Sequence, residues 1–266
     1  MRRLFVALAI FLVACGILPA HAQTLALNFK AGDMYRYSLH FTATFAVTAT
    51  TAAVTENVKV DAKAKEAATV TSVESDGTAD ISLTFSDLSV TTTGKTSDGK
   101  TTTDTTTQKS ALPPQQLRVA PDGRMLGVNG ESVSAASPFG VLVGGELAYA
   151  VLPDSAVKPG DKWSKPYDQS QPGGQSSVHV TTNSTYLRDE SFHGVNAAVV
   201  ETKSKATFTM SGSMLGSVDS DTTSWVDPKA RRVLKSTSKA TLKATITALE
   251  TGLTIDGTQN MDLEPA

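Results

Sequence analysis

The side chains that could perform acid–base or metal chemistry are few in this sequence and lie far apart. His40, His179 and His193 do not have the spacing of metal ligands, so we predict ordinary solvated histidines and no metal site. Asp33 and Asp161 could form a carboxylate pair, but each follows a glycine, which is typical of a turn. These five residues therefore predict no catalytic acid, catalytic base or metal centre.

Nucleophile and phosphate-binding motifs are incomplete as well. The segment 210–214 reads Met-Ser-Gly-Ser-Met, which lacks the Gly-x-Ser-x-Gly pattern of serine hydrolases and is typical of a polar turn. The pairs Gly144-Gly145 and Gly173-Gly174 lack the lysine and hydroxyl residues of a phosphate-binding loop. We therefore predict that the protein is not an enzyme, has no catalytic residues and uses no cofactor.

The N-terminal residues carry the clearest functional signal. Two arginines precede the apolar run 4–13, and the small-x-small sequence Ala20-His21-Ala22 follows it. This order is typical of a bacterial export signal, and it predicts a signal peptide over residues 1–22 with cleavage between Ala22 and Gln23. The apolar run is too short to span a bilayer, which takes about 20 residues.

The same stretch contains a second processing site. Residues 12–16 read Leu-Val-Ala-Cys-Gly, which fits the lipobox at which bacterial lipoproteins are cut and acylated on the cysteine. Two fates are therefore open: a free periplasmic or secreted chain that begins at Gln23, or a membrane-anchored lipoprotein tethered through Cys15. We expect membrane contact only in the second case.

Charge and cysteine content narrow the set of partners. Loss of the two N-terminal arginines takes the formal net charge from −2 to −4, so there is no basic footprint for nucleic acid. Cys15 is the single cysteine, so a chain that begins at Gln23 has neither a disulfide nor a thiol nucleophile. The partners that remain are an apolar small molecule or a protein of the envelope.

Alternation of apolar and polar residues with a period of two runs through much of the sequence. It is clear in 35–49, 79–86 and 234–246. Strands with one apolar face belong to antiparallel sheets, and the Asp-Gly and Asn-Gly pairs between them are typical of hairpins. Several strands reach about 14 to 16 residues, a length that makes a sheet twist and curl. The sequence predicts an all-β or mainly β fold with long curved antiparallel sheets or a partial barrel.

Two features interrupt the strand pattern. The apolar phase slips between Phe85 and Leu88, which predicts a bulge near Asp87. Ser137-Pro138 offers an N-cap and a first-turn proline ahead of apolar residues at spacings of three and four. This second pattern predicts one short connecting helix within residues 132–152.

A weak internal duplication divides the chain at this connector. Residues 30–35 (Lys-Ala-Gly-Asp-Met-Tyr) recur as residues 158–163 (Lys-Pro-Gly-Asp-Lys-Trp), each a turn that leads to an aromatic residue at the start of a strand. The duplication predicts two similar β halves, 23–131 and 153–266. The alternative is chance, because strand and turn patterns in threonine-rich β proteins resemble one another.

The apolar face of the predicted sheet is the remaining candidate site. It carries many alanines and five aromatic residues that we predict to bind a ligand: Tyr35, Tyr37, Phe41, Phe45 and Phe85. Small side chains on a curved sheet can leave room for an apolar ligand. The alternative is that they let another part of the chain pack closely.

These motifs carry a family resemblance. The export signal, the turns at Lys30 and Lys158, the segment 119–123 (Val-Ala-Pro-Asp-Gly) and Leu152-Pro153 resemble a family of bacterial exported proteins of unknown function. More distantly, long curled strands over a helix resemble the half-barrel periplasmic carriers of lipoproteins and lipids. The resemblance implies a carrier or sensor role, although no ligand residue of those carriers matches a position here.

Two hypotheses for function follow. The first is an exported envelope protein that binds an apolar or lipid-like ligand in its curved sheet. The second is a structural or protein-interaction module of the envelope, in which the polar strand faces meet a partner.

Overall fold

The computed structural model describes residues 22–49, 54–95, 98–129, 149–170, 176–210, 214–247 and 252–266. Within these ranges the chain forms twelve strands and no helix, which confirms the predicted β class. In chain order they are β1 (Met34–Ala49), β2 (Val54–Val73), β3 (Ala79–Lys95), β4 (Thr101–Gln108), β5 (Gln115–Val119), β6 (Met125–Asn129), β7 (Lys162–Ser170), β8 (Ser176–Phe192), β9 (Val195–Met210), β10 (Met214–Asp227), β11 (Arg232–Ile246) and β12 (Leu253–Pro265).

The long strands follow the alternation seen in the sequence. In β9 the even residues from Val200 to Phe208 are buried, whereas Lys203 and Lys205 between them are exposed. Side chains of a strand point alternately to its two faces, so this pattern gives the sheet an apolar inner face and a polar outer face. Burial of the inner face against the far side of the same sheet then stabilises the fold.

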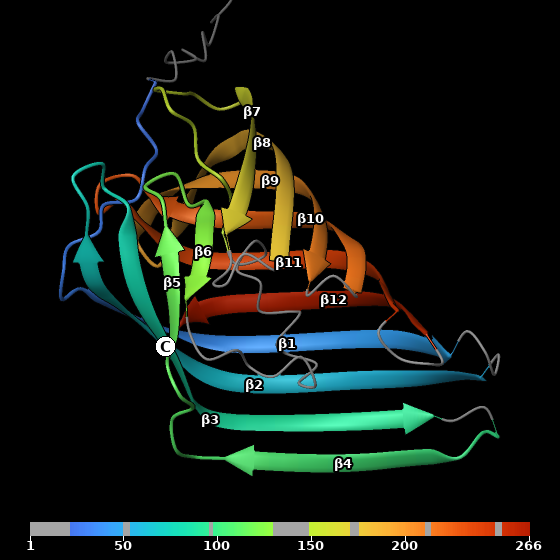
Figure 1. Cartoon of the computed structure of the whole chain (residues 1–266). Coiled ribbons are helices and arrows are strands. Elements are labelled where there is room, and N and C mark those ends of the chain that lie inside the picture. The colour runs from blue at the N-terminus through green and yellow to red at the C-terminus, as the bar shows by residue number, and fades with distance from the viewer. Residues whose placement is uncertain are drawn as a thin grey trace, which may run out of the picture.

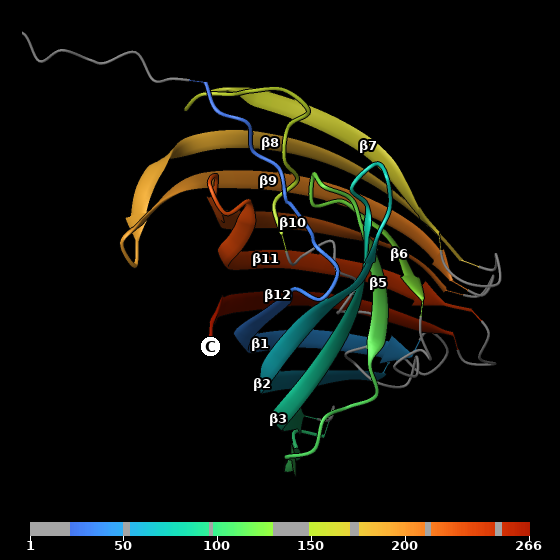
Figure 2. The same cartoon turned by 90° about the vertical axis from the view of Figure 1, so that its left-hand side faces the viewer.

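The twelve strands form one sheet that closes on itself. Its order is β2-β1-β12-β11-β10-β9-β8-β7-β6-β5-β3-β4, and β2 also pairs with β3. Eleven of the described strands therefore form a ring, with β4 paired to β3 outside it. The result is a nearly closed, antiparallel, barrel-like sheet, and Figure 2 shows β7 to β12 as one curved wall of it.

Strand β3 is shared between the ring and its side arm. Its first part, 79–83, pairs with β5, whereas 88–95 pair with β4. Between the two parts Asp87 has a φ of 50°, and the pairing with β2 shifts register between Lys63 and Lys65. The predicted bulge near Asp87 is thus confirmed, and beyond it β3 and β4 run together at the lower edge of the sheet in Figure 1.

The inner face carries three apolar clusters and a band of hydroxyl groups. One cluster surrounds Phe45 and Phe208, a second surrounds Tyr186, and a third lies under β2, β3 and β5. Between the first two runs the hydroxyl band, made of nine buried side chains of β8 to β11: Thr182, Ser184, Thr202, Ser204, Ser220, Thr222, Ser224, Ser236 and Ser238. The interior is therefore apolar along much of its length and polar across its middle.

The segment before β1 covers the second cluster. Leu25 and Leu27 are buried in it, and the Leu27 N–H donates to the Pro121 carbonyl at 2.6 Å. Gln23 forms an antiparallel bridge with Val157. These contacts attach residues 23–29 to loops from both halves of the sequence.

The predicted connecting helix (132–152) falls largely outside the described residues. Its last four residues are described and are not helical. The N–H groups of Ala150 and Val151 instead donate to the hydroxyls of Ser224 and Thr202, at 2.8 and 2.9 Å. The prediction is wrong for this end of the connector, because the hydroxyl band satisfies main-chain donors that a helix would have satisfied.

The two turns of the internal duplication have the same hydrogen-bond pattern. Each turn precedes one strand and bonds to the strand after that one, Val70 of β2 or Tyr186 of β8. The N–H of Gly32 or Gly160 donates to the carbonyl of that residue, and the N–H of that residue donates to the carbonyl of Asp33 or Asp161. The two glycines have φ values of 91° and 96°, which favour glycine. The division into halves 23–131 and 153–266 stays a prediction, because the described strands of both belong to one sheet.

Candidate functional site

The largest apolar cluster of the inner face, named the inner cluster here, draws on β1, β2, β7 to β11 and the segment before β7. Its members are Phe41, Ala43, Phe45, Val60, Ala62, Val151, Tyr167, Val178, Val180, Ala206, Phe208, Met214, Leu242 and Ala244. Each is at least nine-tenths buried. Strands that are far apart in the sheet, such as β2 and β8, thus contribute to one apolar volume.

Two aromatic rings of the inner cluster lie over glycines of neighbouring strands. Gly257 pairs with Phe45, and a Cβ atom at position 257 would lie 2.2 Å from Phe45 Cδ1. Phe208 covers Gly216 in the same way, with 2.3 Å to its Cζ atom. A glycine in a strand leaves room for such a ring, so these two glycines set the orientation of two aromatic side chains.

The small side chains of the inner cluster have a partial explanation in packing. Four of the fourteen members are alanines, and Val151, from the segment before β7, packs into the same cluster. This packing agrees with the alternative reading, in which alanines admit another part of the chain, and that reading stays a prediction.

Two buried glutamines beside the inner cluster have polar atoms without a hydrogen-bond partner. They are Nε2 of Gln169 on β7, a residue 6% exposed, and Oε1 of Gln259 on β12, a residue 4% exposed. In the sheet register they face Val178 and Ala43, both members of the inner cluster. Buried polar atoms are nearly always paired in native proteins, so these two require a partner that the described chain does not supply.

The hydroxyl band, by contrast, is largely paired within itself. Neighbouring strands join Ser184 to Thr202 (2.8 Å), Thr222 to Ser238 (3.0 Å) and Ser224 to Ser236 (3.0 Å). Because hydroxyls both donate and accept, such rows satisfy buried polar atoms without charge. The band therefore holds strands β8 to β11 and the segment at 150–151 in place.

A carboxyl group stands on the inner face beside two of the predicted aromatic residues. Glu66 of β2 is 8% exposed and lies between Tyr37 on β1 and Phe85 on β3 in the sheet register. Burial raises the pKa of Glu66 from 4.5 to about 7, and no other described residue contributes to that shift. Glu66 is thus a buried group that titrates near neutral pH.

Two of the phenols near Glu66, those of Tyr35 and Tyr37, donate their hydrogens to other groups. Tyr37 donates to a main-chain carbonyl of β11 at 2.9 Å, and Tyr35 donates to Asp33 Oδ2 at 3.2 Å. A phenol has one hydrogen, so neither is left to donate to Glu66. Burial, and after it nearby negative charge, raises the pKa of Tyr37 and of Tyr149 above the usual value and that of Tyr35 to about 12.

A second charge cluster, with Lys165 and Asp122 buried and Asp154 exposed, lies where β6 meets β7. Lys165 of β7 places Nζ 2.6 Å from Asp122 Oδ2 and 2.6 Å from Asp154 Oδ1. Asp122, in the turn between β5 and β6, also accepts from Arg124 Nε at 2.7 Å. The side chains of Lys165 and Asp122 are each 10% exposed. Because these charges compensate one another, the cluster joins two elements and leaves no charge for a ligand.

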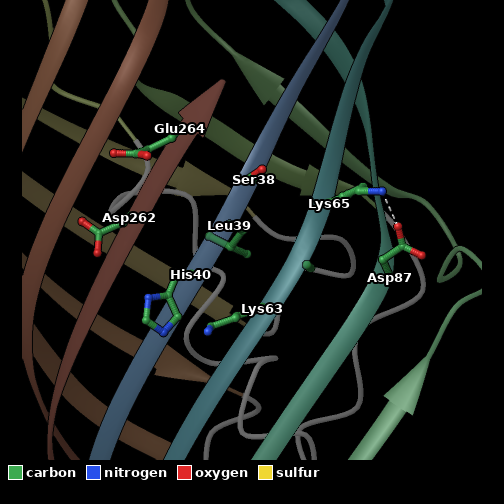
Figure 3. Close-up of a pocket in the computed structure, with 9 residues that line it drawn as sticks. Ser38, Leu39, His40, Lys63, Lys65, Asp87, Asp262 and Glu264 are labelled. Atoms are coloured by element: carbon green, nitrogen blue, oxygen red, sulfur yellow. Dashed lines mark ion pairs between the residues drawn. The ribbon is translucent and has the colours of Figure 1, made fainter. Parts of the chain in front are cut away.

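The outer face carries a hollow of about 460 Å³ bordered by β12, β1, β2 and β3. Figure 3 shows side chains of both signs around it: His40, Lys63, Lys65, Asp87, Asp262 and Glu264. Lys65 Nζ lies 2.6 Å from Asp87 Oδ2, and His40 Nε2 lies 3.4 Å from Asp61 Oδ1. Exposed pairs of this kind contribute little free energy, and the mixed charges favour neither anions nor cations.

The other two histidines lie apart from the inner face. His179 Nδ1 contacts Asp168 Oδ1 at 2.7 Å on exposed side chains, and His193 occupies a turn with a φ of 47°. Within the described ranges, no group of three or more histidine, cysteine or acidic residues could hold a metal ion.

The predicted processing sites lie at or beyond the start of the described chain. Ala22 is exposed, and Gln23 is the residue that bridges to Val157. Cys15 lies outside the described residues, as do the central residues of the segment 210–214. The part of the chain that the structure describes has no helix that is both long and apolar enough to cross a membrane.

The five predicted aromatic residues share the inner face but not one cluster. Phe41 and Phe45 belong to the inner cluster, whereas Tyr35 and Phe85 pack in the cluster under β2, β3 and β5. Tyr37 lies beside Glu66. All but Tyr35 are more than nine-tenths buried. Their role in ligand binding stays a prediction.

The sequence reading missed Glu66, although its position contains a signal. The apolar row of β2, which runs through Val60, Ala62 and Ala64, continues at the same period to Glu66 and Val70. A single carboxyl therefore interrupts an apolar face, which marks it as a functional candidate. Gln169 and Gln259 give a weaker signal, since uncharged amides are common on the wet side of strands.

Comparison with known proteins gives only remote structural similarity. No protein-family model matches the sequence, and no curated protein matches it. DynF from the dynemicin biosynthesis pathway of Micromonospora chersina is 9% identical, with a TM-score of 0.25 over 92% of this chain and 85% of DynF. An outer membrane channel from Pseudomonas putida F1 is 7% identical (TM-score 0.26; 89% and 97% of the two chains). OccK7 of Pseudomonas aeruginosa is 6% identical, with a TM-score of 0.24 over 88% of this chain and 99% of OccK7. Scores this low carry no argument about function.

Proposed function

We propose that this chain is an exported, non-enzymatic protein of the bacterial envelope that binds an apolar or lipid-like ligand on the inner face of its sheet. The observation that carries the proposal is the pair of buried, unpaired amide atoms of Gln169 and Gln259 beside the inner cluster. A ligand with a hydrocarbon part and a polar group would bury its hydrocarbon part against the inner cluster and pair its polar group with the amide of Gln169 or Gln259.

The energetics favour the inner face over the outer one. Burial of apolar surface contributes about 25 cal/mol per Å², and the outer face offers mainly charged and hydroxyl groups. The export part of the proposal rests on residues 1–22. Cleavage before Gln23 gives a periplasmic or secreted binding protein, and acylation of Cys15 gives a membrane-anchored one.

Native mass spectrometry and lipid extraction of the purified mature chain test the proposal. We expect a co-purified ligand in the wild type. Ala43→Phe places a ring in the inner cluster opposite Gln259 and should abolish this ligand, whereas Ala46→Phe, on the other face of β1, should keep it. A ligand-free mass, together with no uptake of added long-chain acid, alcohol or amine, would overturn the proposal.

A protein-interaction role is the second candidate, and strand β4 favours it. Among the described strands β4 pairs with β3 alone, and its side chains from Thr101 to Thr107 are exposed. An edge strand offers main-chain groups to a strand of a partner. A photoreactive residue at Asp104 would capture an envelope protein in cells if this role is correct, and failure to cross-link any protein would count against it.

A further inference from the structure

Glu66 interrupts an apolar row on the inner face. Its neighbours on β2 along this face are Ala64 and Ala68, and across the sheet it faces Tyr37 and Phe85. The residue is more than nine-tenths buried, and no hydrogen bond or ion pair to another described residue satisfies its carboxyl. An ionised carboxylate in such a place requires a counter-charge or donors.

The described chain supplies neither. The nearby phenols of Tyr35 and Tyr37 donate elsewhere. Lys165, the buried lysine of the interior, is paired with Asp122 and Asp154. No basic residue of the described part lowers the pKa of Glu66. The electrostatic environment therefore favours a positively charged ligand group over a negative one.

We propose that Glu66 is the polar anchor of the inner face and receives the ammonium group of an apolar amine. The inference rests on the proposed function, because it names the class of ligand that the inner face binds. The ammonium forms a charge-assisted hydrogen bond with the carboxylate, and the hydrocarbon chain extends along the face.

The spacing along β2 matches the length of a hydrocarbon chain. Ala62, a member of the inner cluster, lies on the same face of β2, four residues before Glu66. That separation is about 13 Å along an extended strand. A dodecyl chain is long enough to reach from an ammonium at Glu66 into the inner cluster.

Isothermal titration calorimetry on the delipidated mature chain tests the proposal with three probes, namely dodecylamine, dodecanol and dodecanoate. We expect the amine to bind most tightly at pH 8. Glu66→Gln should weaken the binding of dodecylamine about tenfold to a hundredfold and change the binding of dodecanol little, because the variant removes only the charge-assisted hydrogen bond. Glu56→Gln, an exposed position on the same strand, is the matched control and should bind all three as the wild type does.

Protonation supplies a second readout. Glu66 ionises near pH 7, whereas the nearby phenols of Tyr35, Tyr37 and Tyr149 stay neutral between pH 6 and 8. The Arg232 guanidinium acts on Tyr35 and Tyr37 but does not contribute to the pKa shift of Glu66. The amine should therefore bind more weakly at pH 6 than at pH 8, and this difference should vanish in Glu66→Gln.

The outcomes separate the two proposals. Binding of dodecanol or dodecanoate, with the amine bound equally by the wild type and Glu66→Gln, would overturn the amine assignment and leave the proposed function standing. Failure of all three probes to bind would overturn both. Selective loss of amine binding in Glu66→Gln, with dodecanol binding retained, supports both proposals and shows that the variant is folded.

Discussion

Individual residues of this protein place polar groups where the surrounding strand is apolar, and Glu66 is the clearest case. Its pKa lies above the value of an exposed glutamate because the ionised form is desolvated. The native state therefore binds the Glu66 proton more tightly than the unfolded state does. Stability contributed by this residue is largest at acid pH and is lost as pH rises from the unfolded value of about 4.5 through the folded value of about 7.

Glu66→Gln should therefore stabilise the protein at neutral and alkaline pH. With 1.36 kcal/mol per pKa unit, the gain is roughly 3 kcal/mol at pH 8, and it should vanish at pH 4, where the wild-type carboxyl is protonated in both states. Urea unfolding at pH 4, 6 and 8 measures it. Glu56→Gln, which changes an exposed side chain, should show no such pH dependence. If the wild type instead became more stable than Glu66→Gln as pH rises, the raised pKa of Glu66 would be contradicted.

The aromatic lining depends on residues with no side chain at all. Gly257→Ala brings a Cβ atom within 2.2 Å of Phe45 Cδ1, so the ring must move. We expect a loss of about 1–3 kcal/mol in the free energy of unfolding, typical of overpacking. In a Phe45→Ala background the same change should cost much less, and additive costs in this double-mutant cycle would show that the ring and the glycine do not interact.

Among the elements, the junction of β6 and β7 is the weakest part of the ring. One parallel residue pair, Gly127–Ser170, joins the two strands, whereas neighbouring antiparallel pairs run the length of β8 and β9. The Lys165–Asp122 ion pair and the hydrogen bond from the Leu152 N–H to the Asp122 carbonyl (2.8 Å) cross the same junction. An ion pair and a hydrogen bond between loops thus replace strand pairing where the sheet closes.

Lys165→Met should consequently destabilise the protein. It leaves Asp122 buried with Arg124 as its remaining cation, and breaking a buried pair costs about 3–5 kcal/mol. Lys162→Met, on the exposed face of β7, should change the free energy of unfolding by less than about 0.5 kcal/mol. Chemical denaturation of both variants checks this, and equal stability of Lys165→Met and wild type would show that the ion pair does not hold the junction.

Strands and turns were accessible from the sequence because their causes are local. The alternation in 35–49 reflects the pleat of β1, and the Asp87 bulge shows as a slip in apolar phase. Pairings between distant strands were not accessible. Register between Tyr37 and Pro265, or the route of Ala150 across the hydroxyl band, depends on groups far apart in the chain that no local pattern relates.

At the scale of the whole molecule, one continuous sheet turns its apolar residues inward and most of its charged residues outward, with Glu66 and Lys165 among the exceptions. The segment from Gln23 to Phe29 then seals one apolar cluster by packing Leu25 and Leu27 against it. The position of this N-terminal segment is therefore coupled to closure of the sheet, because the segment forms hydrogen bonds with the Pro121 carbonyl and with Val157.

This coupling bears on processing. Ala22 is exposed and outside the bridge, while the Gln23 N–H donates to the Val157 carbonyl at 2.8 Å. Cleavage after Ala22 would leave that hydrogen bond in place, so we expect the intact mass of the mature protein to correspond to a chain that begins at Gln23. A mass for a diacylated or triacylated chain that begins at Cys15 would contradict this; residues 16–22 would then form a tether of at most about 25 Å.

The sequence by itself determined the strand character, the hairpins, the bulge near Asp87 and the apolar face that bears the five aromatic residues, because each follows from the period and chemistry of nearby residues. Only the tertiary structure decided which strands meet and what lies inside. Closure of the ring turned Glu66, Gln169 and Gln259 inward, left Gln169 Nε2 and Gln259 Oε1 without a partner among the described residues, and buried Glu66 with no described basic residue shifting its pKa. Solvation depends on every strand that surrounds a side chain, and that arrangement exists only once the sheet has closed.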